Sequence, residues 1–352
     1  MKKMRTVLAV AGLFLAMALS TTSAMADTIW TGGGDGVNWS DTLNWSADPT
    51  TAGGTFTLPT GTESTVDTDT TAWTDYTVVW ADDTVTLNVI AGGVLENNGM
   101  HQPNGGTLRQ TGGEVNFGNR VQGVGGLTEI SGGSYRNARW TYVSSGTLHI
   151  IGSQPTSVSI GTFPSWSSTA QLTARFTLDA NGVTPMLLGS EGDFNGQAPT
   201  SGFITVDVDG IATYLAGSGK VGDILPLVTR SGGLKYSAAW TMGLVDCGLG
   251  SLGLDVDGNL QLTILGVPEL AITEIQYAPD ADTVTLTWAS RPCTTYKAFV
   301  TLDLIDWSHE LANSLGPDTG GIIVDGNLLT MSFTLTDGLE DEPDVFFRIQ
   351  EE

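Results

Sequence analysis

The sequence predicts an all-β protein: a short right-handed β-solenoid with a β-rich cap, followed by a C-terminal β-sandwich. Three observations support this fold class. Glycine makes up 46 of the 352 residues, about twice the usual share of ~7%, and Thr, Val and Ser are abundant, which favours strands and turns over helices. Glycines return every 20 residues in the first half of the chain. The C-terminal part alternates apolar and polar residues, as strands of a sandwich do.

The glycine register spans four repeats. It consists of Gly92-Gly93, Gly112-Gly113, Gly132-Gly133 and Gly152-Ser153, with a second register at Gly106, Gly126 and Gly146. A fixed period of this length predicts a solenoid, in which each turn buries its apolar side by stacking on its neighbours.

Two interior columns are expected from this period. One contains Leu95, Val115, Tyr135 and Pro155, and the other contains Ile90, Gln110, Ile130 and Ile150. Equivalent residues of stacked strands lie about 4.8 Å apart and share one interior. Gln110 is the polar exception in its column.

The N-terminus predicts export. Lys2, Lys3 and Arg5 precede an apolar run over residues 7–19, and Ala24-Met25-Ala26 supplies small residues at a cleavage position. We expect residues 1–26 to be a secretory signal peptide cleaved after Ala26, and the mature protein to be extracellular or at the cell surface. No later segment is long and apolar enough to predict a membrane span.

Charge restricts the partners. The chain has 14 Lys+Arg against 38 Asp+Glu, a formal net charge of −24. Nucleic acids and anionic lipids are held mainly by Lys and Arg, so we expect neither as a partner. The candidate partners that remain are an extracellular glycan and a surface protein.

A Trp- and Gly-rich segment precedes the solenoid. Trp30-Thr31-Gly32-Gly33-Gly34-Asp35-Gly36 is followed by Asn38-Trp39-Ser40 and Asn44-Trp45-Ser46. We expect the three tryptophans to seal the first turn; the alternative is a surface that stacks on sugar rings.

With the Gly-Gly turns, this segment resembles exported bacterial β-solenoid proteins with autotransporter-associated β-strand repeats, found in Planctomycetes and Verrucomicrobia-like bacteria. FTLDANGVTP at 176–185 and LGLDVDGNLQLTIL at 252–265 are similar to the segment that closes those solenoids. The resemblance implies residues 27–155 as N-terminal segment and solenoid, and residues 156–266 as a β-rich cap.

Residues 267–352 are expected to form the sandwich, with strands near 272–277, 283–288, 296–301, 328–336 and 345–349. Thr283 to Trp288, Ser290-Arg291-Pro292, Asp303 to Trp307 and Phe346-Phe347-Arg348 resemble a fibronectin type III-like domain. Cys293 stands where that family often has Gly. In an exported chain Cys247 and Cys293 could form one disulfide, although two unpaired buried thiols fit nearly as well.

Few residues predict chemistry. Asp207-Val208-Asp209-Gly210 and Asp255-Val256-Asp257-Gly258 lack the spacing of a helix-loop-helix calcium loop. Asp-Gly at a hairpin turn explains both, with calcium as the alternative. The three histidines, His101, His149 and His309, have no ligand spacing.

Arginines suggest one binding surface. Arg120, Arg136, Arg139 and Trp140 could form a cationic and aromatic strip along one side of the solenoid, able to bind a sugar or an acidic group. The alternative is a solvated edge that offsets acidic charge. With no catalytic motif, the sequence favours an exported structural or adhesive protein without catalysis or cofactor, the alternative being a carbohydrate-binding or polysaccharide-active β-helix protein.

Overall fold

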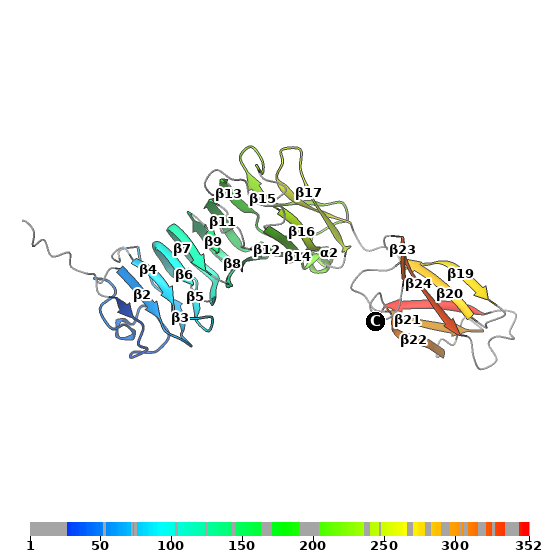
Figure 1. The fold of residues 1–352 in the computed structure, drawn as a ribbon, viewed down its shortest axis with the longest axis horizontal. Coiled ribbons are helices and arrows are strands. Elements are labelled where there is room, and N and C mark those ends of the chain that lie inside the picture. The colour runs from blue at the N-terminus through cyan, green and yellow to red at the C-terminus, as the bar shows by residue number, and fades with distance from the viewer. Residues whose placement is uncertain are drawn as a thin grey trace, which may run out of the picture.

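The structure is a computed structural model that describes residues 27–351 except 52–53, 72, 74–75, 103–104, 124, 139, 143–144, 163–170, 191–203, 236–239, 246–247, 266–269, 279–282, 290–295, 303–304, 306–308, 316–321, 326–327 and 335–344. The regular secondary structure of the described part is almost entirely strands, and Figure 1 shows those of the first two thirds stacked side by side. This confirms the all-β solenoid with a C-terminal β-sandwich. Residues 1–26, which we expect to be a signal peptide, lie outside the described residues, as do Cys247 and Cys293.

Three walls of parallel strands make up the solenoid. The first wall stacks β3 (Glu63–Val66), β5 (Thr86–Val89), the start of β7 (Thr107–Gly123), the start of β8 (Gly126–Asn137), β10 (Ser145–Ile151), β12 (Gln171–Thr177), β14 (Ile204–Asp209) and β16 (Trp240–Val245). The second wall stacks β6 (Val94–Gln102), the middle of β7, the end of β8, β11 (Pro155–Thr162), β13 (Met186–Ser190) and β15 (Ile224–Arg230).

Within the described residues, the third wall lies in the N-terminal half of the chain. It stacks β1 (Thr28–Ile29), β2 (Gly54–Leu58), β4 (Tyr76–Trp80), the ends of β6 and β7, and β9 (Trp140–Tyr142). β7 therefore contributes to all three walls of a single coil. Parallel stacking also extends past the glycine register, because β12, β14 and β16 continue the first wall through residues assigned to the cap.

Antiparallel strands close the C-terminal end of the stack. β15 pairs with β18 (Leu260–Ile264), which pairs with β17 (Gly250–Leu254). The Asp257-Gly258 turn joins β17 to β18, as expected for a hairpin. Asp209-Gly210 is not a hairpin turn: β14 pairs in parallel on both sides, and Gly210 leads into helix α2 (Ile211–Ala216).

The interior columns differ from the expected ones at their ends. Gln110 lies between Val89 and Ile130, while Ile90 is 38% exposed, because the step from β5 to β7 is one residue longer than the glycine register. Val158 rather than Pro155 is the partner of Tyr135, because Pro155 already pairs with Gly133 and a bulge between Pro155 and Ser157 shifts the register by one more residue. Gln110 is fully buried and its amide nitrogen donates to the carbonyl oxygen of Ser134 at 2.9 Å.

Glycine pairs at the corners allow successive coils to approach closely. Gly113 and Gly133 have φ of 64° and 74°, a region that residues with a Cβ rarely adopt. A Cβ at either position would also collide with a backbone carbonyl of the coil below, that of Gly93 or Gly113 respectively. The period therefore reflects both backbone conformation and contact between coils.

The tryptophans seal the N-terminal end, as expected. Trp30, Trp39 and Trp45 are at most 6% exposed, and the rings of Trp39 and Trp45 meet edge to face with centroids 5.0 Å apart. Because their faces are buried, these residues are not a sugar-stacking surface.

The Gly, Asp and Asn residues between the tryptophans hold this seal in shape. Asp35 accepts hydrogen bonds from the backbone N–H groups of Val37 and Asn38 and from the Asn44 amide, next to the 3-10 helix η1 (Thr42–Asn44). Asn44 in turn accepts from the N–H groups of Gly34 and Gly36. The pKa of Asp35 falls well below its usual range because of these bonds, that from Asn38 first.

A separate core holds the C-terminal sandwich together. One sheet has the order β19 (Ile272–Ala278), β20 (Thr283–Ala289), β24 (Leu328–Thr334), β23 (Ile322–Asp325), and the other β22 (His309–Leu315), β21 (Tyr296–Thr301), β25 (Phe346–Glu351). Trp288 from the first sheet and Tyr296 from the second are fully buried and meet edge to face at 5.8 Å. The five expected strands of this unit are confirmed over their described residues, and β22 and β23 are two strands that were not expected.

Candidate functional site

A column of polar side chains runs across the outer face of the second wall. Glu96 of β6, Asn116 of β7 and Arg136 of β8 occupy equivalent positions on adjacent strands. Their neighbours Leu95, Val115 and Tyr135 are buried. Because successive side chains of a strand point to opposite faces, the polar column faces outward.

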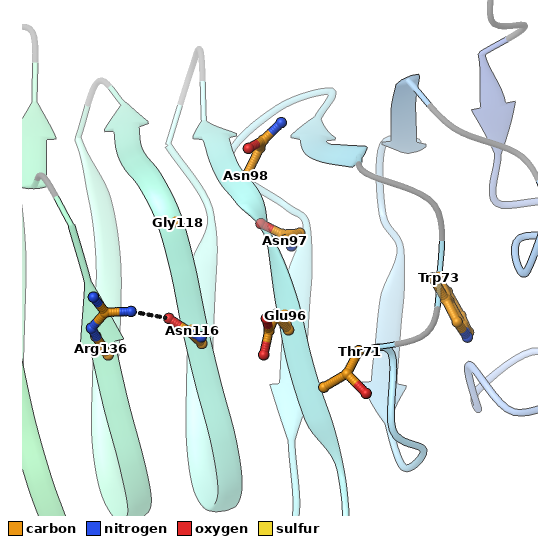
Figure 2. Close-up of a pocket in the computed structure, with 8 residues that line it drawn as sticks. All are labelled: Thr71, Trp73, Glu96, Asn97, Asn98, Asn116, Gly118 and Arg136. Carbon is orange, nitrogen blue, oxygen red and sulfur yellow. Dashed lines mark hydrogen bonds between the residues drawn. The ribbon is translucent and has the colours of Figure 1, made fainter.

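This column forms one side of a groove of about 360 Å³ (Figure 2). Thr71 and Trp73 lie on the other side, in the loop before β4, and the lining is completed by Asn97, Asn98 and Gly118. The pairing of β6 with β7 shifts register between Asn97 and Gly99, which is where Gly118 lies. A Cβ added at Gly118 would meet nothing closer than the Asn97 carbonyl oxygen at 3.6 Å, so the lack of a side chain here keeps the groove open.

A buried hydroxyl fixes the loop that carries Thr71 and Trp73. The Thr70 hydroxyl donates to the Val94 carbonyl at 2.8 Å and accepts from the Glu96 N–H at 3.0 Å and from the Tyr76 hydroxyl at 2.9 Å. Thr70 is fully buried. These bonds tie the loop to β6, so the two sides of the groove keep their spacing.

Trp73 is held from behind by the aromatic seal. Its ring stacks on Trp39 with centroids 5.7 Å apart and planes 12° apart, and lies 5.9 Å from Phe56. A rim indole in a fixed orientation needs no ordering when a ligand binds, which lowers the entropic cost of association.

The polar groups of the groove suit reversible binding. Arg136 Nη1 donates to Asn116 Oδ1 at 3.1 Å, and Glu96, Asn98 and Thr71 are exposed. Amides, a hydroxyl, one carboxylate and a guanidinium provide both donors and acceptors. The lining has one carboxyl group, whereas glycosidic hydrolysis usually requires two, and it contains no Cys, His or Lys.

Two buried polar residues, Tyr76 and Asn97, lie beneath the groove. Burial raises the pKa of Tyr76, and the Thr70 hydroxyl and the Asn97 amide offset part of the increase. Neither amide atom of Asn97 makes a hydrogen bond of ordinary geometry within the described residues, although the side chain is 7% exposed.

The first wall carries a second polar array. Arg109 pairs with Glu129 at 3.1 Å, and Arg175 pairs with Asp209. His149 lies between these pairs, with Nε2 2.8 Å from the Thr177 hydroxyl and Nδ1 3.9 Å from Glu129. Burial, and then Arg175, lowers the pKa of His149.

One of the four residues predicted to form the strip contributes to the groove, namely Arg136. Arg120 pairs with Gly99 and Trp140 with Val121, so both belong to the third wall by backbone position; their side chains, like all of Arg139, lie outside the described part. The sequence analysis did not predict Glu96 and Asn116, although Glu96, Asn116 and Arg136 follow one another at 20-residue intervals. Thr71 and Trp73 had no such signal, because they come from a loop.

The aspartates considered for calcium have local partners. Asp209 faces Arg175, and Asp255 accepts from the N–H groups of Asp257 and Asn259 at 2.9 and 2.8 Å. Within the described residues, no group of three His, Cys, Asp or Glu side chains is arranged to hold a metal ion. A calcium site at Asp207 and Asp209 or at Asp255 and Asp257 stays a prediction.

Comparisons with protein families, with curated proteins and with solved structures found no match to this chain. The described part of the chain contains no helix long and apolar enough to cross a membrane. Functional inference therefore rests on the groove and on the walls that build it.

Proposed function

We propose that this protein is an exported, non-catalytic adhesive protein that binds an extracellular glycan through the groove on its second wall. One observation carries the proposal: Arg136, Asn116, Glu96 and Thr71 line the same groove beside the Trp73 indole. Sugars present many hydroxyl groups and weakly polar C–H faces. Mixed donors and acceptors next to an aromatic ring complement both.

The placement of the groove supports adhesion. It lies on rigid strands of a solenoid that is sealed at one end by buried tryptophans and closed at the other by antiparallel strands. Signal-peptide cleavage after Ala26 and a surface location belong to the same proposal, as does the fibronectin-like character of the C-terminal sandwich.

A glycan array with the purified protein tests the function, and Gly118→Phe supplies the decisive variant. Space is open at Gly118, so a phenyl ring there should fill the groove without strain and weaken glycan binding at least about tenfold. The matched control is Gly253→Phe, because a Cβ at Gly253 also meets nothing within 4 Å and β17 is far from the groove. Equal binding by both variants would contradict the groove as the site.

The catalytic alternative has one specific observation in its favour, the contact between His149 and the Thr177 hydroxyl. A histidine base beside a hydroxyl is the arrangement that activates a nucleophile. This alternative predicts turnover of a polysaccharide or ester that His149→Ala abolishes. A hydrolase screen with measurable turnover would overturn the non-catalytic proposal.

A further inference from the structure

Arg136 differs from the paired arginines of the first wall. Arg109 and Arg175 each form an ion pair with a carboxylate on a neighbouring strand. In the described structure Arg136 makes a single hydrogen bond, to the neutral Asn116, and no ion pair. Among the described residues, this outward guanidinium therefore has no carboxylate partner, in a chain with 38 acidic residues.

The hydrogen bond to Asn116 orients both side chains. Asn116 uses its oxygen to accept from Arg136 Nη1, so its amide nitrogen remains to donate. Arg136 retains its other N–H donors. Together the two side chains present N–H groups, one set of them charged, at one end of the groove. Such a pair matches the oxygens of a carboxylate or sulfate group.

The opposite end of the column has the opposite character. Glu96 lies two strands from Arg136, about 9.6 Å away at the usual strand spacing of ~4.8 Å. Its carboxylate accepts hydrogen bonds from hydroxyl groups and repels a second anion. The net charge of −24 adds to this repulsion over the whole molecule.

We infer that the groove selects an oligosaccharide carrying a single acidic substituent, with the acid at Arg136 and neutral sugar hydroxyls toward Glu96, over neutral glycans and over polyanions. This inference rests on the proposed glycan-binding function. It explains why the cation is unpaired, since the ligand supplies the missing carboxylate or sulfate.

The test compares four probes by calorimetry: a neutral oligosaccharide, the same chain with one uronic acid, the same chain with one sulfate, and a polyuronate. We expect either singly charged probe to bind about tenfold more tightly than the neutral one, as a charge-assisted contact provides. Comparison of the uronic acid probe with the sulfate probe distinguishes a carboxylate ligand from a sulfate ligand. The preference should weaken as salt is raised.

Four variants test which residues cause the preference for a singly charged glycan. Arg136→Gln should abolish the preference, because affinity for the singly charged probes should fall to that for the neutral probe, while Arg136→Lys should retain part of it. Arg109→Gln removes the same charge from the first wall and should change nothing. Glu96→Gln should raise affinity for the polyuronate.

The possible failures are distinguishable. Equal binding of neutral and acidic probes, unchanged by Arg136→Gln, would overturn the inference and leave glycan binding intact. If the folded wild-type protein binds no glycan, the proposed function fails and the inference fails with it. Circular dichroism of each variant establishes that the fold is kept.

Discussion

His149 shows how a place on a solenoid wall changes the chemistry of one side chain. Its sequence neighbours predict a wall residue, and the structure places it there, hydrogen-bonded to Thr177. The sequence could not indicate which charged residues lie next to His149 on the neighbouring strands. Burial and then Arg175 oppose a positive charge on His149, Asp209 and Glu129 favour it, and the net effect lowers the pKa of His149.

A pH dependence of stability follows from the lowered pKa of His149. Between that lowered value and its ordinary value of 6.5, the unfolded chain binds more protons than the folded one. Stability should therefore rise with pH through this window and fall as the pH drops below about 6.5. His149→Gln removes the titrating group. Urea unfolding from pH 5 to 7.5 should show a weaker pH dependence for the variant, and identical profiles would contradict the prediction.

At the scale of elements, the glycine corners determine how closely coils stack. Positive φ is a backbone reason for glycine at both Gly92 and Gly133, and the structure adds a contact reason at Gly133 that it does not add at Gly92. Gly92 has φ of 89° with nothing near its missing Cβ, whereas a Cβ at Gly133 would meet the carbonyl of Gly113.

This difference predicts a graded cost of substitution. Gly92→Ala carries only the left-handed backbone penalty of about 1–2 kcal/mol. Gly133→Ala carries that penalty and a collision with the coil below, so it should cost clearly more, measured as the free energy of unfolding in urea. Gly92→Ala serves as the matched control. Equal costs would show that the coils can separate locally without loss.

The groove is also an element-level feature. Glu96, Asn116 and Arg136 follow the repeat, so a sequence reading could have aligned them. The depth of the groove depends on the register shift near Asn97 and on a loop anchored by the Thr70 hydroxyl. The register shift and the position of the loop both depend on pairing between segments that the 20-residue glycine period does not describe.

For the whole molecule, two separate cores imply two separable stabilities. The solenoid core runs from Trp30 to Ile264, and the sandwich core contains residues such as Trp288 and Tyr296. In a stacked solenoid each coil contacts only its neighbours, so damage at one end spreads along the stack rather than through a single centre.

Trp39→Ala tests this arrangement. Trp39 is fully buried and its indole N–H donates to Ser64 at 3.2 Å. Removing a buried aromatic ring should cost about 3–5 kcal/mol, and hydrogen exchange should show β1 to β5 losing protection first. Trp288→Ala is the control: it should destabilise the sandwich and leave the exchange of the solenoid unchanged. Loss of protection everywhere in both variants would indicate one cooperative unit.

The sequence by itself determined the fold class, the glycine-marked coils, the seal of buried tryptophans and five of the seven described strands of the sandwich. These depend on local periodicity, on backbone conformation and on burial, which are written in neighbouring residues. Tertiary structure alone decided which columns align, how far the parallel walls continue, that Asp209-Gly210 leads into a helix, and that Arg136 shares a groove with Glu96 and Trp73. The physical reason is that each of these depends on register between strands far apart in the chain, where one bulge or one added residue moves a side chain to another neighbour.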